Sequence, residues 1–472
     1  MTKVGSEVAQ GPAVTHTANA EVARTPAVTH TAGAGVVQTH SPGVPLAPGP
    51  EPAAAVSTGV AGRYRWVIVS LLFAAMVVNY VDRQTIGLLK PDLSRQFGWS
   101  ETDYADLVFY FQLSYAVAYI AWGKVMDNIG ARWGFGVAFL VWQIAHIAHA
   151  GARSLNGFIF ARTALGIGEA GGFPAGIKAV AEWFPKKERA LAIGVCNAGT
   201  NIGAIVTPLV IPAVVLAYGW QMAFVATGLA GLLWLPLWLL IYRRPREQRR
   251  VGAAELAHIE QDAPEPLEKI GWLRLLTRRE TWAYALGKFL IDPIWWMFLF
   301  WLPDFLGKRY GLDLASFGPP LIAIYLLSDI GSVGGGWLSS WLMKRGWSIN
   351  EARKSTMLIC ALLALPVMFA ADVSSLWLAV LIIGVATAAH QGFSANLYTL
   401  PSDVFPRGAV GSVAGIGGML GAFGGMLFAK YVGDVLERIG SYTPIFVVAG
   451  SGYLLALLVI HLLSPRMAPV KG

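Results

Sequence analysis

The feature that most constrains this chain is a succession of apolar stretches, each about twenty residues long, that begins at Arg65 and continues nearly to the end. A helix needs about 20 apolar residues to cross the hydrocarbon core of a bilayer. Only 14% of the 472 residues are charged, against about 25% in average soluble proteins. The pattern therefore predicts an all-α membrane protein. It excludes a water-soluble enzyme, a fibrous protein and a mainly disordered chain.

The apolar stretches accommodate twelve membrane-spanning helices, six on either side of a charged central segment. We expect these helices near residues 65–87, 104–124, 131–150, 155–180, 189–214, 219–242, 281–306, 317–343, 354–371, 374–400, 408–432 and 441–463. The result is six helices on each side of a central basic loop.

Composition and charge divide the chain into five parts. The first part is rich in Ala, Thr, Val and Pro and repeats the heptapeptide Pro-Ala-Val-Thr-His-Thr-Ala. Such a composition cannot bury enough apolar surface to offset the entropy of ordering, so we expect it to be disordered. The parts are a cytoplasmic tail at 1–62, an N-terminal bundle at 63–242, a cytoplasmic central loop at 243–279, a C-terminal bundle at 280–464 and a cytoplasmic tail at 465–472.

The distribution of basic residues predicts the orientation in the membrane, because cytoplasmic loops carry an excess of Lys and Arg. Basic clusters occur at 186–189, at 243–250 and at 344–354, and these segments fall on the same side if the N-terminus is inside. Both termini are therefore expected in the cytoplasm. The formal net charge of +8 lies in these short clusters, so we expect no nucleic-acid partner.

A glycine- and charge-bearing loop follows the second predicted helix. It reads Gly123-Lys-Val-Met-Asp127-Asn-Ile-Gly130-Ala-Arg132, which resembles the signature of the major facilitator superfamily. A weaker counterpart, with Ser340 in the place of the aspartate, follows the eighth helix. The resemblance implies two related bundles and a gating role for Gly123, Asp127 and Arg132.

Further motifs narrow the resemblance. Asn-Tyr-Val-Asp-Arg at 79–83, Gly-Glu-Ala-Gly-Gly-Phe-Pro-Ala at 168–175 and Trp-Phe-Pro-Lys-Lys-Glu-Arg at 183–189 look like the anion:cation symporter family. Within that family, Ala-His-Gln-Gly at 389–392 and Ser-Asp-Val-Phe at 402–405 are similar to bacterial hexuronate transporters. The resemblance implies uptake of an organic anion together with protons.

Charges inside the membrane are expensive unless they are paired or hydrated, so each is a functional candidate. Arg83 and Arg162 are predicted to bind a substrate carboxylate, because a guanidinium recognises it bidentately. Each arginine has an acid within reach on its own helix: Asp82 is next to Arg83, and Glu169 shares a helix with Arg162. When substrate displaces the acid, that acid takes up a proton more readily. The competing interpretation is that these pairs only gate or pack the helices.

Lys288 and Asp292 are four residues apart and can pair directly on one helix. We expect Lys288 in the substrate site and Asp292 in gating, although the two can also simply satisfy each other. His146 and His149, three residues apart, suggest a proton relay, and packing against a neighbouring helix is the alternative we favour.

Polar and aromatic side chains in otherwise apolar helices are predicted to bind the hydroxyls and the ring of a sugar acid. They are Asn79, Tyr80, Gln112, Tyr115, Asn197, Asn201, Trp296, His390, Gln391 and Asn396. Hydrogen bonding within the core is the alternative for each of them.

These predictions combine into one interpretation: a proton-coupled symporter that imports a hexuronate such as galacturonate or glucuronate across a bacterial inner membrane. We expect a monomer without cofactor or bound metal. The alternatives are a uniporter, a carrier of aldonates, aldarates or other organic anions, and a polytopic membrane enzyme. No Gly-x-x-x-x-Gly-Lys-Ser/Thr phosphate loop is present in the sequence, so a gradient is expected to supply the energy.

Overall fold

The structure is a computed structural model that describes residues 62–262 and 271–468, and within these ranges every regular element is helical. The helices before the central segment are α1 (Tyr64–Phe97), α2 (Glu101–Ala148), the 3-10 helix η1 (His149–Gly151), α3 (Leu155–Glu169), α4 (Gly172–Trp183), α5 (Lys186–Tyr218), α6 (Trp220–Leu232) and α7 (Trp234–Ile241). The predicted tail at 1–62 lies, apart from its last residue, outside the described residues.

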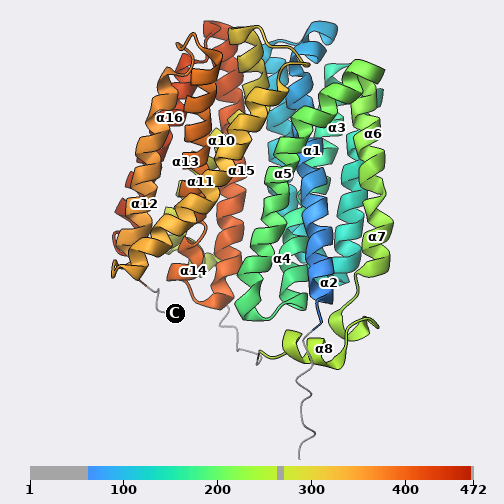
Figure 1. Cartoon of the computed structure of the whole chain (residues 1–472), viewed down its shortest axis with the longest axis vertical. Helices are drawn as coiled ribbons and strands as arrows, with labels where there is room; N and C mark the ends of the chain where they lie inside the picture. Colours follow the sequence, from blue (N-terminus) through green and yellow to red (C-terminus); the bar gives the residue numbers. More distant parts are fainter. Residues whose placement is uncertain (1–61, 263–270, 469–472) are drawn as a thin grey trace, which may run out of the picture. The chain divides into compact units, whose positions relative to one another are not determined.

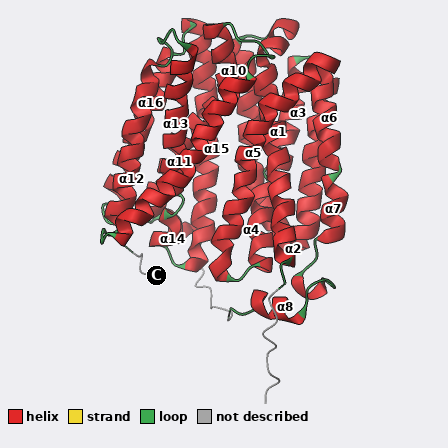
Figure 2. Ribbon diagram, viewed as in Figure 1, coloured by secondary structure: helices red, strands yellow, loops and turns green. Residues whose placement is uncertain are grey.

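The central segment holds η2 (Pro245–Glu247), α8 (Ala253–Ile259) and α9 (Trp272–Leu276). The helices that follow are α10 (Arg279–Tyr310), α11 (Gly318–Lys344), α12 (Ile349–Ala364), η3 (Leu365–Phe369), α13 (Leu376–Leu397), α14 (Leu400–Val404), α15 (Arg407–Ile439) and α16 (Thr443–Leu463). Figure 2 shows helices almost throughout the described chain.

The helices occupy the predicted stretches, with differences at their ends that have local causes. The first helix does not end at residue 87 but runs to Phe97, because Leu88, Leu89 and Leu93 are buried and continue its packing face. The second and third predicted helices join in α2, which is interrupted where Gly130 adopts φ 79° and ψ 164°. Only glycine adopts such a conformation at little cost. The break therefore lies inside the motif loop.

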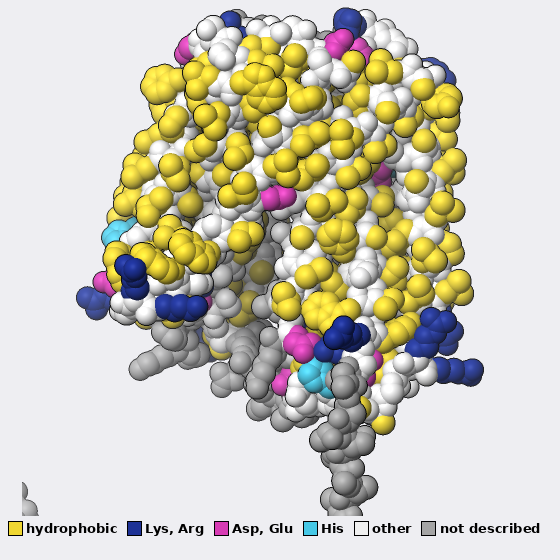
Figure 3. All heavy atoms as spheres, viewed as in Figure 1, with side chains coloured by type: hydrophobic (Ala, Val, Ile, Leu, Met, Phe, Trp, Pro, Cys, Tyr) yellow, Lys and Arg dark blue, Asp and Glu magenta, His cyan; other side chains and the backbone are white. Residues whose placement is uncertain are grey.

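Ten helical stretches of the described residues are long and apolar enough to cross a membrane. The first part of α2 is not among them, and α3 and α4 are too short to be counted, with 15 and 12 residues. Many large apolar side chains face outward, for example Phe160 at 76% and Leu233 at 72% exposure. Figure 3 shows apolar side chains over most of the visible face. Such an apolar surface is suited to lipid and not to water.

Helices of the first and second halves pack both within and between the halves. Within the first half α2 packs on α3 and α1 on α5, and within the second α11 packs on α13 and α10 on α15. Between the halves α2 contacts α15, α5 contacts α11, and α1 contacts α10. Figure 1 shows the blue-to-green first half beside the yellow-to-red second half. Of these contacts, only that of α1 with α10 joins the first helices of the two halves, whereas each of the other two joins the second predicted helix of one half to the fifth of the other.

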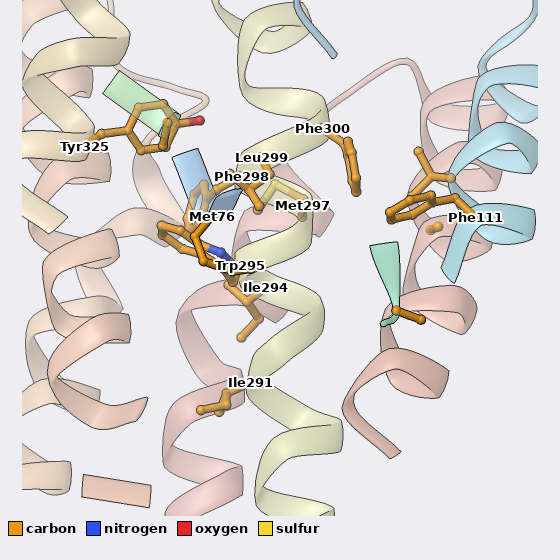
Figure 4. Close-up of a cluster of buried hydrophobic side chains, with 14 of the residues drawn as sticks. Met76, Phe111, Ile291, Ile294, Trp295, Met297, Phe298, Leu299, Phe300 and Tyr325 are labelled. Carbon is orange, nitrogen blue, oxygen red and sulfur yellow. The ribbon is translucent and has the colours of Figure 1, made fainter. Parts of the chain in front are cut away.

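The helix α10 forms the centre of the buried core. In the most apolar stretch of α10, 78% is buried inside the protein, whereas the corresponding share in α11 is 28%. Trp295, Phe298 and Phe300 of α10 are among the buried side chains drawn in Figure 4. This helix is therefore enclosed by protein, whereas α11 lies at the periphery.

The predicted central loop contains a short helix that is attached to the first half. The main-chain nitrogen of Arg65 donates to Glu255 Oε1 of α8 at 3.0 Å, and Arg65 Nε donates to Glu188 Oε2 at 2.9 Å. His258 Nε2 lies 2.9 Å from Glu188 Oε1. Burial would raise the pKa of Glu188, but the hydrogen bonds from Arg65 and His258 outweigh it and hold that pKa below its usual value. These contacts join α8 to the starts of α1 and α5.

Candidate functional site

The centre of the first half contains a buried ion pair between α1 and α3. Arg83 Nε donates to Glu169 Oε2 at 2.8 Å, and its Nη2 lies 2.6 Å from the same oxygen. Arg83 is 4% exposed and Glu169 is 1% exposed. Asn79, one turn before Arg83 on α1, lies beside the same carboxylate. Glu169 Oε1 has no hydrogen-bond partner, so half of this carboxylate is still able to accept a proton or a hydrogen bond.

Arg162 of α3 is fully buried, yet none of its three guanidinium nitrogens has a hydrogen-bond partner among the described residues. Its guanidinium carbon lies 4.4 Å from the centre of the Phe111 ring and 5.5 Å from that of Phe300. Figure 4 shows these two rings, which come from α2 and α10. Contacts with aromatic rings offset only part of the cost of burying a charge. Arg162 is therefore a buried cation that forms no ion pair with an acid of the described residues.

The glycines of α3 explain how these charges come close to α1 and α2. A Cβ at Gly166 would overlap the carbonyl oxygen of Phe111, and one at Gly168 would overlap the backbone of Trp142. Only glycine allows two helix backbones to approach so closely. The glycine-containing segment around Glu169 thus brings α3 against α2.

Aromatic and amide side chains surround the two arginines. Arg83 lies 4.9–5.5 Å from the ring centres of Tyr80, Phe111, Tyr115 and Trp296. Gln112 is fully buried, and neither its Nε2 nor its Oε1 has a partner. The structure therefore assembles Arg83, Arg162 and Gln112 in one aromatic setting, with unsatisfied donors and acceptors available to a polar ligand.

The two expected pairs of an arginine with an acid of its own helix do not form in the structure. Asp82 does not pair with its neighbour Arg83, because adjacent residues of a helix point about 100° apart. Its Oδ2 accepts hydrogen bonds from Trp142 Nε1 at 2.7 Å and Gln143 Nε2 at 2.9 Å. Glu169 in turn binds Arg83 and not Arg162. The expectation that each acid lies beside the arginine of its own helix is therefore wrong.

The charged pair of the second half satisfies itself. Lys288 Nζ lies 2.7 Å from Asp292 Oδ2 and 3.3 Å from the hydroxyl of Tyr398. A Cβ at Gly421 would overlap Asp292, so α15 approaches this pair closely. The pair is neutral and already hydrogen-bonded, in contrast to Arg162.

The other predicted residues of the second half have different surroundings. His390 stacks on Trp295, with ring centres 5.3 Å apart, and its nitrogens lie 3.0 Å from Tyr453 Oη and 3.2 Å from Ser394 Oγ. Asn396 Nδ2 donates to two main-chain carbonyls of α11 and α13. Gln391 is partly exposed and has no hydrogen-bond partner in the described chain. His390 and Asn396 are thus committed to protein contacts.

The remaining predicted residues lie away from the two arginines. Asn197 is exposed and lines a small apolar pocket between α1, α4 and α5, and Asn201 is partly exposed next to Thr200. At the motif loop, Arg132 Nε donates to the carbonyl oxygen of Leu239 at 3.0 Å, which joins α2 to α7. A Cβ at Gly123 would meet open space, and the side chain of Asp127 lies outside the described ones.

An ionic cluster that sequence reasoning missed joins the two halves at the ends of α1 and α10. Lys90 Nζ of α1 lies 2.7 Å from Glu101 Oε2 of α2 and 2.8 Å from Asp304 Oδ2 of α10. Lys308 lies four residues after Asp304 and contacts both acids. That i, i+4 spacing was the available sequence signal. The cluster closes this end of the molecule, whereas Figure 3 shows the surface hollowed between the halves toward the end that carries α8.

A largely helical protein with an apolar exterior and buried charges between its helices has the features of a multi-pass membrane protein. Comparisons with known proteins specify the class. Residues 72–429 match the family model of the Major Facilitator Superfamily. The chain is 32% identical over 403 residues to the hexuronate transporter of Escherichia coli K12, over 84% of this chain and 93% of that protein.

A second relative and a solved structure are also similar to this chain. The chain is 31% identical over 307 residues to the galacturonate transporter of Dickeya chrysanthemi, over 63% of this chain and 88% of that protein. The crystal structure of a bacterial homolog to the human lysosomal transporter Spinster, inward-facing and unoccupied, matches with a TM-score of 0.67 at 18% identity over 86% of this chain and 96% of that one.

The chain therefore belongs to the Major Facilitator Superfamily. It is a multi-pass membrane transporter and not an enzyme. The predicted family and its resemblance to bacterial hexuronate transporters are confirmed.

Proposed function

We propose that this transporter imports a sugar acid with one carboxylate, a hexuronate such as galacturonate or glucuronate, together with protons. The observation that carries the proposal is Arg162, a buried guanidinium without an anion, beside the Arg83–Glu169 pair. A carboxylate fits a guanidinium bidentately. The names of the hexuronate and galacturonate transporters support this substrate class.

The charge count of the site favours one substrate carboxylate. Arg162 lacks an anionic partner, whereas Lys288 is already paired with Asp292. A second carboxylate, as in an aldarate, would have to displace Asp292 from Lys288. Trp296 and Tyr115 lie beside Arg83 and offer aromatic faces to a sugar ring, while Gln112 offers both a donor and an acceptor to hydroxyls.

Proton coupling follows from competition for Arg83. Without substrate, Glu169 neutralises Arg83. A substrate carboxylate held between the two arginines competes with Glu169, and a carboxylate that loses its cationic partner takes up a proton more readily. The loaded carrier then contains anion and proton together, which lowers the cost of moving them through the protein.

The proposal extends to topology and location. Two six-helix bundles at 63–242 and 280–464, with twelve spans and cytoplasmic termini, would rock about the central site. The Lys90–Asp304 cluster would close the outer side. We further propose a monomer in a bacterial inner membrane.

A related candidate is an open-chain aldonate, because a D-galactonate transporter of Escherichia coli is 27% identical over 423 residues. An aldonate also has one carboxylate and therefore suits Arg162 equally. An open-chain aldonate has no sugar ring on which the side chains of Trp296 and Tyr115 could stack.

The test is uptake of labelled galacturonate, glucuronate, galactonate and galactarate into proteoliposomes, with and without an inward proton gradient. We expect accumulation of a hexuronate above equilibrium that collapses with a protonophore. Glu169→Gln should retain exchange of substrate across the membrane and lose proton-driven accumulation. Full accumulation by Glu169→Gln would contradict the coupling scheme, and better uptake of galactarate than of galacturonate would contradict the substrate class.

A further inference from the structure

Asp82 is the second buried acid of the first half, and its setting differs from that of Glu169. It is fully buried, and neither Arg nor Lys forms an ion pair with it in the described chain. Its Oδ2 is held by the donors Trp142 Nε1 and Gln143 Nε2. Its Oδ1 has no hydrogen-bond partner and lies 3.2 Å from His146 Nε2.

Hydrogen bonding defines which nitrogen of His146 carries the hydrogen. Thr227 Oγ1 donates its single hydrogen to the carbonyl oxygen of Ala223 at 2.7 Å. At its 2.8 Å contact with His146 Nε2, the hydroxyl must therefore accept. Nε2 thus bears the hydrogen in the neutral imidazole, and Nδ1 is a bare acceptor.

The Asp82–His146 pair consequently contains two acceptor atoms that receive no hydrogen bond from the described residues. Asp82 Oδ1 and His146 Nδ1 are both buried, and neither receives a hydrogen bond. A buried charge without a counter-ion is costly, and one added proton at either atom removes the net charge of the pair. On Nδ1 it forms an imidazolium beside the carboxylate, and on Oδ1 it forms a neutral carboxyl. In both cases the net charge of the pair changes from −1 to 0.

We propose that Asp82 and His146 form a single proton-holding pair, in which His146 is a positioning residue that also supplies a second site for the proton. The proposal deepens the proposed function, because it rests on proton coupling and names a second group that performs it. It also separates the two acids: Glu169 responds to the substrate through Arg83, whereas Asp82 holds its proton with His146.

Other titratable groups face the pair from the surrounding helices. Glu169 and Arg162 of α3 act on it through space, and so does His149 of η1. With no substrate, the positive charge of Arg162 disfavours an imidazolium at His146. A substrate carboxylate on Arg162 removes this repulsion, so anion binding promotes loading of the proton.

His149 provides a matched control on the same helical segment. It is also fully buried, and its ring stacks on Phe224 with centres 5.0 Å apart and an angle of 9°. Its Nδ1 lies 2.9 Å from the carbonyl oxygen of Ala145 and 3.2 Å from that of His146, and neither ring nitrogen contacts a carboxylate of the described residues. It therefore shares the burial of His146 without the acid.

The decisive variant is His146→Gln, because the glutamine Nε2 can keep the donor to Thr227 but cannot hold a further proton. We expect the pH of half-maximal proton-driven uptake to shift to lower pH by about one unit. Exchange of substrate at equal pH on both sides should stay within about threefold of wild type, because that exchange needs no net proton movement. His149→Asn, which preserves the Nδ1 donor, should leave the pH profile unchanged. An unchanged pH profile in His146→Gln would overturn the pair.

A second readout needs no substrate. The pH-difference infrared spectrum of the purified protein should contain a protonated-carboxyl band that disappears in Asp82→Asn. We expect this band to appear only at lower pH in His146→Gln and to be unmoved in His149→Asn. If wild type does not carry a sugar acid but the band moves in His146→Gln, the pair stands and the proposed substrate fails. If wild type is proton-coupled and the band does not move, the pair fails and the proposed function stands.

Discussion

The charged side chains at the centre of the two halves of this transporter differ in how completely they are paired. In the first half, ionised groups from α1 and α3 leave atoms unsatisfied, including the whole guanidinium of Arg162 and one oxygen of Glu169. In the second half, Lys288 and Asp292 of α10 neutralise each other within one helix. A satisfied pair has little to gain from a ligand, whereas an unpaired buried cation gains the full interaction. Under the proposed function, the first half would therefore supply the charge that binds the substrate, and the second half would supply the aromatic side chain of Trp296 beside it.

The largest expected effect is the loss of the unpaired cation. Arg162→Gln should reduce hexuronate uptake by about a thousandfold, equivalent to about 4 kcal/mol, because it removes a desolvated charge that pairs with the substrate. Arg162→Lys should recover only part of this loss, since an ammonium cannot bind a carboxylate bidentately. Initial rates in proteoliposomes measure both. If Arg162→Gln took up hexuronate at the wild-type rate, the proposed difference between the two halves would be wrong.

The next prediction concerns the satisfied pair. Lys288→Met should lower the free energy of unfolding by about 3 kcal/mol, because it leaves Asp292 buried without its cation. The double variant Lys288→Met with Asp292→Leu should recover most of that loss, because no uncompensated charge remains. Thermal unfolding in detergent measures the stability of both variants, and uptake assays measure their transport activity. If the double variant were as inactive as Arg162→Gln, the second half would have to bind substrate directly.

A smaller effect is expected where helix backbones touch, and here the halves should behave alike. A Cβ at Gly199 of α5 would overlap the carbonyl oxygen of Phe73, and one at Gly424 of α15 would overlap that of Phe289. Each Gly→Ala change should destabilise by about 1–3 kcal/mol through overpacking. Gly194→Ala is the control, because its Cβ would meet nothing. Equal melting temperatures for Gly199→Ala and Gly194→Ala would show that α5 does not pack on α1 this closely.

The smallest effect is expected at the contact that only the first half makes with α8. The folded-state pKa of Glu188 is lowered, so its charge stabilises the fold above its unfolded pKa, and this contribution is lost as pH falls through the folded value. Glu188→Gln should therefore cost about 0.5 kcal/mol at neutral pH. The difference from wild type should vanish in acid. Melting temperatures between pH 7 and pH 4 measure this, with Glu247→Gln as a control that should not change, because Glu247 is exposed and forms no ion pair in the described chain.

Much of the architecture could be predicted from the sequence, because membrane insertion depends on local composition. Apolar runs of about twenty residues located the helices, most of whose boundaries lie within a few residues of the predicted ones. The extension of α1 beyond residue 87 was missed, because Lys90 and Pro91 interrupt the apolar run while their neighbours are buried by tertiary packing. The motif loop at 123–132 was enough to indicate the superfamily, because its residues are contiguous in the chain.

The sequence by itself determined that this chain is a helical membrane transporter with charged residues inside the membrane, because hydropathy and residue type are properties of each segment alone. Only the tertiary structure decided which charges are partners. Arg83 and Glu169 are 86 residues apart, and Asp82 meets His146 although its neighbour in sequence is an arginine. Spacing predicts a pair correctly only within one helix, as at Lys288 and Asp292. Between helices the partner depends on the rotation and close approach of each helix, which the glycines of α3 permit but do not specify.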